Sequence, residues 1–366
     1  MPSGDGQSLS LRAQTNGKYY QNYSVSFHEP WIGGKRPNSL SVSAYRSIQT
    51  AVSNNYGYYG YGSNDYGFGN DFYQPDFDEN KYQKVTGVSV GFGKRLSWPD
   101  DYFSLYTELS YQNYKIKNWW YVSPTFKTGT SNILALTASL SRSSIDNPIY
   151  SRRGSSFNLS LQFTPPYSLF NDINYNTAKD VDKYKFIEYH KWKANAQAFT
   201  PLSKDAKLVL MSRAEYGFLG FYSKAAQSPF ERFSLGGDGM SGYNLYGTET
   251  IGLRGYENGS LTPYDASGES MGNLYTKLTM ELRYPLMLEP SSTIYALVFA
   301  EAGRAWADFR DFNPFDLKRS VGAGVRVFLP MFGMLGIDWA WGFDQPESGG
   351  NTNNGSQFHF VIGQQF

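Results

Sequence analysis

The sequence predicts an all-β fold, a transmembrane antiparallel β-barrel with about fourteen strands. Three observations predict it: strand-length segments alternate apolar and polar residues, the connections alternate between short and long, and aromatic residues and glycine are abundant. The chain has 366 residues, among them 30 Tyr, 26 Phe and 37 Gly. Its mean hydropathy is below zero, as expected for a barrel in which polar lumen-facing residues dilute the lipid-facing ones.

The alternation of apolar and polar residues recurs along the whole chain. It is clearest in segments 9–14, 39–44, 103–111, 134–141, 157–163 and 335–343. Leu159 and Leu161, for example, alternate with Asn158, Ser160 and Gln162. Because successive side chains of a strand point to opposite faces, one face is expected to contact lipid and the other to line a wet lumen. The alternative, a soluble all-β protein, would have polar outward residues and mostly short loops.

The runs give about fourteen strands, each near the ~9–11 residues that a tilted membrane strand needs. We expect them to begin near Gln7, Tyr19, Ser39, Tyr82, Phe103, Ser131, Ser155, Lys185, Lys207, Gly272, Thr293, Ser320, Met334 and Gln357. The Thr293 strand is ambiguous because residues 294–302 are small or apolar on both faces. Short connections, such as 98–101 and 330–333, alternate with long ones, such as 50–81 and 219–271.

This pattern predicts the location of the protein. Barrels of the bacterial outer membrane have short periplasmic turns and long external loops. An integral outer-membrane barrel with an even number of strands has both termini in the periplasm. Residues 1–6 have neither the basic start nor the apolar stretch of a signal peptide, which such a protein needs. The chain is therefore expected to be a fragment of something longer.

Composition excludes several functions. The formal net charge of +1 provides no field that would attract nucleic acid. The absence of Cys excludes disulfides and thiolate chemistry, and no window approaches the roughly 20 apolar residues of a spanning helix. His28, His190 and His359 are the only imidazoles, and none has hydrolase or metal-ligand spacing. We expect no enzyme, no catalytic residue, no metal and no cofactor. Alternation turns His359 into the lumen, as a hydrogen-bonded wall residue.

The long segment 219–271 is the most informative part of the chain, because a loop of this length in a compact fold is usually functional. It contains Leu253-Arg254-Gly255-Tyr256. Here the sequence resembles the BamA family of the surface-antigen superfamily, the central subunits of the outer-membrane β-barrel assembly machinery. In that family a [V/I/L]-R-G-[F/Y] motif lies in the sixth external loop, which folds back into the lumen.

The resemblance implies two partners for Arg254. In the family the motif arginine pairs with acidic residues on the two strands that follow the loop. The runs Thr279-Met280-Glu281-Leu282 and Phe299-Ala300-Glu301-Ala302-Gly303-Arg304-Ala305-Trp306 match those positions. Alternation independently turns Glu281 inward, whereas it makes no prediction for Glu301. A guanidinium in a confined lumen should bridge carboxylates by charge-assisted hydrogen bonds, and this would pin the loop as a brace.

The C-terminal segment 357–366 carries a second resemblance. Phe358, Phe360, Ile362 and the terminal Phe366 share one face, similar to the terminal strand signal of outer-membrane barrels. In the BamA family this strand forms the lateral seam. The family barrel has sixteen strands, so the resemblance implies a single barrel domain over 1–366, with 219–271 as its lumen-inserted loop. The POTRA repeats and the first two barrel strands would then be missing.

The function implied by the resemblance is the folding and insertion of β-barrel proteins into the outer membrane through the lateral seam. The implied partners are unfolded β-barrel clients, accessory assembly lipoproteins, outer-membrane lipids and lipopolysaccharide, with no nucleic acid. Related alternatives are a two-partner secretion transporter or the barrel of the translocation and assembly module. A plain diffusion porin would lack the loop motif. A surface enzyme anchored by this barrel is a further alternative.

Overall fold

The computed structural model describes residues 6–34, 38–53, 76–119, 126–239, 248–266, 268–289, 291–331, 333–347 and 355–363. In these ranges, fourteen strands form one antiparallel sheet whose order follows the chain, with β9 next to β12. They are β1 (Ser8–Asn16), β2 (Tyr20–Glu29), β3 (Asn38–Ser53), β4 (Asp76–Arg95), β5 (Phe103–Lys117), β6 (Gly129–Ser143), β7 (Gly154–Phe163), β8 (His190–Pro201), β9 (Val209–Gly220), β12 (Leu274–Glu289), β13 (Ser292–Trp306), β14 (Lys318–Leu329), β15 (Gly333–Gly342) and β16 (Ser356–Ile362).

The remaining elements are short and lie between these strands. Two strands pair in parallel inside the connection from β9 to β12, namely β10 (Phe233–Leu235) and β11 (Glu249–Ile251). The helical turns are η1 (Ile32–Gly34), η2 (Tyr167–Leu169), α1 (Asp180–Lys183), η3 (Lys224–Ala226) and η4 (Phe309–Asp311). None of the described helices is both long enough and apolar enough to cross a membrane.

Most strands begin within two residues of the predicted position, but β4 and β8 differ by more. β4 begins at Asp76, because after a register shift its first residues pair with the end of β3. β8 begins at His190 rather than near Lys185. Instead, the amide of Asn132, near the start of β6, donates to the Lys185 carbonyl at 2.9 Å, and the Ile187 amide donates to the Asn132 carbonyl at 2.9 Å. Alternation within residues 185–187 cannot show whether this segment continues β8 or bonds to β6.

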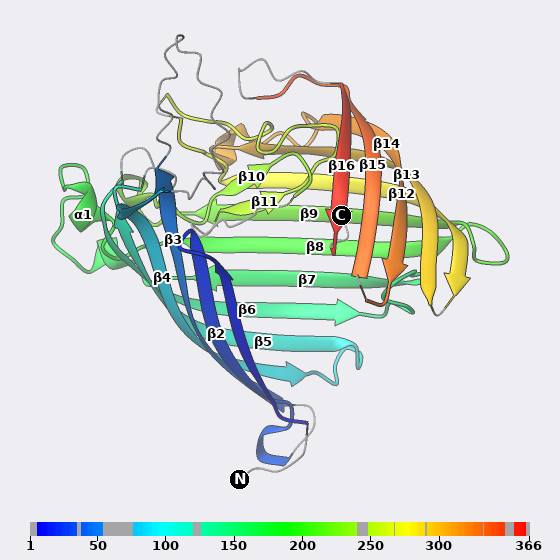
Figure 1. The fold of residues 1–366 in the computed structure, drawn as a ribbon, viewed down its shortest axis with the longest axis horizontal. Helices are drawn as coiled ribbons and strands as arrows, with labels where there is room; N and C mark the ends of the chain where they lie inside the picture. The colour runs from blue at the N-terminus through cyan, green and yellow to red at the C-terminus, as the bar shows by residue number, and fades with distance from the viewer. Residues whose placement is uncertain are drawn as a thin grey trace, which may run out of the picture.

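The outer face of the sheet is apolar and the inner face is largely polar. In β12, Leu278 and Met280 are 44% and 52% exposed, whereas Lys277, Thr279 and Glu281 are at most 2% exposed. The predicted fold class is confirmed: the sheet is the wall of a transmembrane barrel, with every second side chain directed outward. Figure 1 shows this wall curving continuously from blue β1 through green β7–β9 to red β16.

The expectation of a wet interior along the whole wall is wrong in part. On the inner face of β8, β9 and β13, apolar side chains form a buried cluster that includes Phe199, Met211 and Leu297. Tyr150, from the connection between β6 and β7, packs edge-on against Tyr295 at 5.2 Å between ring centroids. Connections that fold inward therefore cover lumen-facing positions and exclude water from them, so an inward residue can be apolar.

The two edges of the sheet are β1 and β16. In the described part of the chain, β1 pairs only with β2 and β16 only with β15. Unpaired backbone groups at a sheet edge are costly in hydrocarbon and bind another strand readily. The edges are therefore the positions at which this wall can accept a further strand.

Candidate functional site

The loop from β9 to β12 lies against the inner face of the wall. Its Phe233, Leu235 and Leu253 are fully buried. Backbone hydrogen bonds tie it to β13: the Asn273 amide donates to the Trp306 carbonyl, and the Ala305 amide donates to the Leu261 carbonyl. The described residues of 219–271 thus lie against the inside of the wall, where the sequence predicts an inserted loop.

Arg254 is the centre of a buried ionic cluster. Its side chain has no exposed surface, and its Nη2 donates to Glu281 Oε1 and to Glu301 Oε1, each at 2.8 Å. The Arg254 backbone amide donates to Glu301 Oε2 at 2.9 Å. Its guanidinium carbon lies 3.4 Å from the centre of the Phe299 ring, a favourable position for a cation. The predicted pairing of Arg254 with both glutamates is therefore present.

A third carboxylate, which the sequence analysis did not assign to the cluster, also binds Arg254. Asp338 of β15 accepts from Arg254 Nη1 at 3.2 Å and from both terminal nitrogens of Arg326 at 2.6 Å. Gly324 and Gly336 lie opposite Asp338 and Arg326 on the neighbouring strands. A Cβ on either glycine would clash with these charged side chains. Alternation placed Asp338 on the polar face, but nothing in its local sequence shows that it reaches Arg254.

The cluster is balanced by further cations on the wall. Arg283 binds Glu281 at 2.6 Å, and Lys277 lies 3.4 Å from Glu301. Burial by itself would lower the pKa of Arg254, but the carboxylates of Glu301 and Glu281 raise it above the usual arginine range. Arg254 is thus a permanent cation. Each buried carboxylate of the cluster has more than one cationic partner, as a dry ionic cluster requires.

The residues that follow Arg254 connect the loop to the last strands. The Gly255 amide donates to His359 Nε2 on β16 at 2.9 Å. The Tyr256 hydroxyl donates to the Arg319 carbonyl at 2.7 Å and accepts from the Asp344 amide at 3.2 Å. His359 is therefore a hydrogen-bonded wall residue, as predicted. The loop motif, residues 253–256, therefore contacts five strands: β12, β13, β14, β15 and the terminal strand β16.

Gly255 is expected to be intolerant of a side chain. Its φ is +88°, and an added Cβ would lie 3.0 Å from the Gly342 amide and 3.1 Å from Ser320. Gly255→Ala should lower the free energy of unfolding by about 2 kcal/mol or more, because left-handed strain adds to a contact with rigid wall backbone. Urea unfolding in detergent measures this. Gly268→Ala, which has the same sign of φ and open space around it, is the control for strain alone. Equal losses in the two variants would contradict the close-contact argument.

A second ionic contact anchors the loop to β8. Lys191 is 5% exposed and lies 3.2 Å from Glu231 and 3.3 Å from Glu249, both in the loop. Lys193 binds Glu249 at 3.1 Å, and Phe233 lies under the Lys191 ammonium. The loop is therefore fixed to β8 at one end and to β12–β16 at the other. The sequence analysis missed this contact, because its partners are neither near in sequence nor part of the motif.

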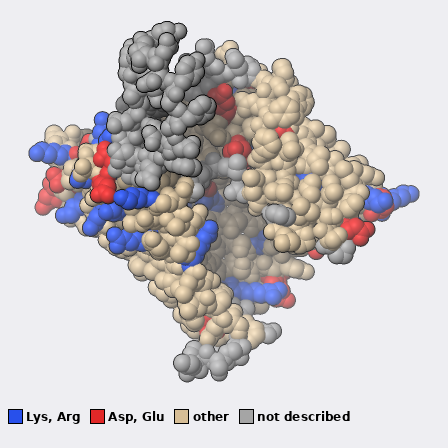
Figure 2. Space-filling view, in the orientation of Figure 1, with Lys and Arg blue, Asp and Glu red and all other residues tan. Residues whose placement is uncertain are grey.

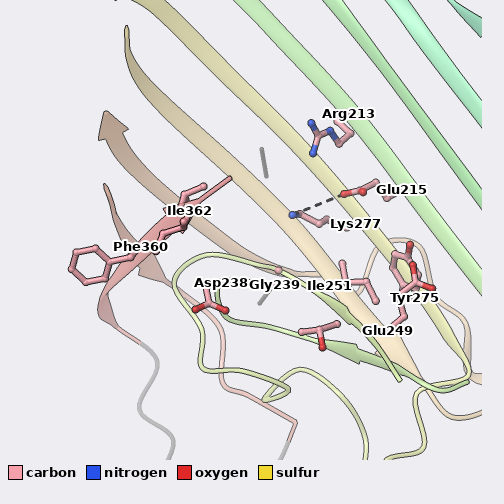
Figure 3. A pocket seen from close by; sticks show the side chains of 13 residues that line it. Arg213, Glu215, Asp238, Gly239, Glu249, Ile251, Tyr275, Lys277, Phe360 and Ile362 are labelled. Carbon is pink, nitrogen blue, oxygen red and sulfur yellow. Dashed lines mark ion pairs between the residues drawn. The ribbon is translucent and has the colours of Figure 1, made fainter. Parts of the chain in front are cut away.

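A cavity of about 180 Å³ lies between the loop and the wall. Figure 3 shows Glu215 and Lys277 facing each other from neighbouring strands, with Asp238 and Gly239 of the loop beside them. The cavity also reaches residues 360–362 of β16. Space inside the barrel therefore extends to the terminal edge strand.

The terminal strand has the predicted facing. Phe358, Phe360 and Ile362 are 67%, 59% and 63% exposed on the outer face, whereas His359 and Val361 are buried. Phe366 lies outside the described residues. β16 is thus an apolar edge strand whose inner side contacts the loop.

The wall, the buried loop and the arginine cluster together define a transmembrane barrel of the kind whose lumen loop is held by an Arg-Gly-Tyr motif. Residues 3–366 match the Omp85 superfamily domain, and the chain belongs to this superfamily. Within it the chain is BamA-like. It is 31% identical over 147 residues to the outer membrane protein assembly factor BamA of Neisseria meningitidis serogroup B, which is 38% of this chain and 16% of that protein.

Solved structures show the same fold. BamA from Haemophilus ducreyi lacking POTRA domains 1–3 superposes with a TM-score of 0.64 at 17% identity, covering 97% of this chain and 65% of that chain. CdiB from Escherichia coli gives a TM-score of 0.53 at 11% identity, covering 93% of this chain and 52% of that chain. The chain thus spans less than two thirds of each relative.

Proposed function

We propose that this chain is the membrane barrel of an assembly factor that folds and inserts β-barrel proteins into the bacterial outer membrane. The observation that carries the proposal is the terminal strand. β16 is the apolar edge strand of the described sheet, and it is held from inside through His359 and Gly255. An incoming strand can pair with such an edge by β-augmentation, while the anchored loop keeps the edge in place.

Location and partners follow from the same proposal. The long connections face outside and both termini face the periplasm, as an even strand count requires. Unfolded barrel proteins are the clients, accessory lipoproteins assist, and outer-membrane lipids including lipopolysaccharide surround the wall. The protein acts by strand pairing without a catalytic residue or cofactor. The similarity to a curated BamA over 147 residues supports this assignment.

The test is insertion of a client. The full-length protein encoded by the gene is reconstituted into liposomes and supplied with an unfolded outer-membrane barrel. Folding of the client is measured by its shifted mobility in unheated gels and by protease protection. We expect faster client folding than in empty liposomes, and cross-linking of client strands to cysteines placed at β16. The proposal fails if the full-length protein gives no acceleration.

A related translocation or secretion barrel is the second candidate, and the similarity of the fold to CdiB favours it. Such a barrel would move a soluble chain across the membrane rather than leave a strand in it. The same liposomes distinguish the two, because a translocated client becomes protected in the vesicle lumen without acquiring barrel mobility. A barrel that anchors a surface enzyme would do neither.

A further inference from the structure

Cations gather on the outer face of β3, β4 and β5, at the end where the long connections lie. Arg46 shares the outward face of β3 with Val42, Lys84 that of β4 with Val88, and Lys115 and Lys117 that of β5 with Leu109. We call Arg46, Lys84, Lys115 and Lys117 the basic patch. Figure 2 shows Lys and Arg side chains at the left of the view, with Asp and Glu side chains among them.

The strand register places like charges side by side in the basic patch. Lys84 lies directly opposite Lys115, and Arg46 is diagonal to Lys84, which pairs with Ile48. Like charges directly opposite across two strands are destabilising unless an anion lies between them. This arrangement therefore favours a bound anion.

The nearby carboxylates do not neutralise the patch. Asp78 pairs with Lys81 at 3.2 Å, and Glu79 pairs with Lys18 at 3.7 Å. Lys117 donates to the neutral Asn80 at 2.9 Å. Within the described ranges, Arg46, Lys84 and Lys115 have no ion pair with a carboxylate. Lys84 lies over the Tyr82 ring, at 4.2 Å from its centroid, but no described carboxylate forms an ion pair with it, so Arg46, Lys84 and Lys115 can each bind an anion.

An apolar groove adjoins the patch on the lipid-facing wall and crosses β1, β2, β3 and β4. It has a volume of about 540 Å³, and Arg46 of the patch is one of its lining residues. Its outward side chains include Leu11, Tyr23, Val25, Ala44 and Val88. Ala44 leaves a depression between larger neighbours, which suits a hydrocarbon chain. Cations that can bind phosphate and a groove that can hold an acyl chain thus lie next to each other on the outer face of the wall.

We propose that the basic patch and this groove bind the phosphorylated lipid anchor of lipopolysaccharide, with phosphate at the cations and an acyl chain in the groove. A glycolipid with several phosphates and acyl chains matches cations spread over three strands better than a phospholipid with one phosphate. Arginine and lysine are the residues that recognise phosphate. The inference rests on the proposed outer-membrane location, in which the long connections face the leaflet that holds this lipid.

The test uses the full chain in neutral detergent and diphosphoryl lipid A as the probe, with native mass spectrometry giving the apparent Kd. Lys84→Gln/Lys115→Gln should weaken binding about 25-fold, because each cation near an anionic surface contributes about fivefold. Lys204→Gln/Lys207→Gln removes two exposed lysines from the short turn at the opposite end and should change binding less than about twofold. Unheated gel mobility verifies folding, and Arg46→Gln decides the matter if the double variant does not fold.

Three results would overturn the assignment: unchanged affinity in the patch variants, equal binding of dephosphorylated lipid A, or equally tight binding of phosphatidylglycerol. The last would mean a general anionic-lipid surface. The assay needs no client, so it is independent of the insertion test. If the chain binds lipid A in a phosphate-dependent way but inserts no client, the lipid site stands and the proposed function is refuted. If it inserts clients but does not bind lipid A in that way, the proposed function stands and the lipid site is refuted.

Discussion

Replacing Arg254 with alanine is expected to release the loop 219–271 from the wall and to lower the free energy of unfolding by about 3–5 kcal/mol. The change removes the cation shared by Glu281, Glu301 and Asp338, all at most 2% exposed. Buried carboxylates that lose a partner keep the cost of their desolvation. Urea unfolding in detergent measures the global loss, and trypsin cleavage within the loop measures its local release.

Two matched variants make this result specific. Arg319→Ala removes an arginine that binds Asp344 at 3.0 Å but whose side chain is 67% exposed, so the free energy of unfolding should change little, as for other exposed ion pairs. Arg254→Lys should be intermediate, because an ammonium cannot reproduce a planar fork with several carboxylates. If Arg254→Ala leaves both stability and loop protection unchanged, the cluster is not what holds the loop.

Asp338→Ala is expected to cost about as much, roughly 3–5 kcal/mol, although neither the loop motif nor the resemblance assigned a role to Asp338. Without this carboxylate, Arg326 loses both of its 2.6 Å hydrogen bonds while 2% exposed. Arg254 keeps Glu281 and Glu301, so the loop should stay largely protected from trypsin. This variant should therefore lose global stability in the urea experiment without releasing the loop to trypsin.

The double variant Arg326→Met/Asp338→Leu is the control for Asp338→Ala. It removes both charges together and fills the space with apolar atoms, which often restores stability at a buried ion pair. We expect it to unfold at a higher urea concentration than Asp338→Ala. If the single variant costs nothing, or the double variant is no better than the single one, the pair does not contribute as the geometry indicates.

Much of the site could be predicted because local alternation and the motif agree. Glu281 faces inward by period two, and Arg254 belongs to a motif whose family pairs it with carboxylates. Glu301 is different, because its strand is apolar on both faces, and only the register with Thr279 and Ser320 shows which way it points. Asp338 and Lys191 were missed for another reason. Their loop partners are 84 and 40–58 residues away, and no local pattern records such contacts.

The sequence by itself determined the wall: fourteen strands, their facing and the positions of most turns, because each depends on residues a few positions apart. It also identified the loop motif and the apolar terminal strand. Only the tertiary structure decided which side chains contact one another inside the barrel. The curvature of the sheet brings β8, β12–β16 and one loop to a common interior. There a cation such as Arg254 is stable only where carboxylates from distant strands converge on it, and that convergence is a property of the curved arrangement of the strands in space.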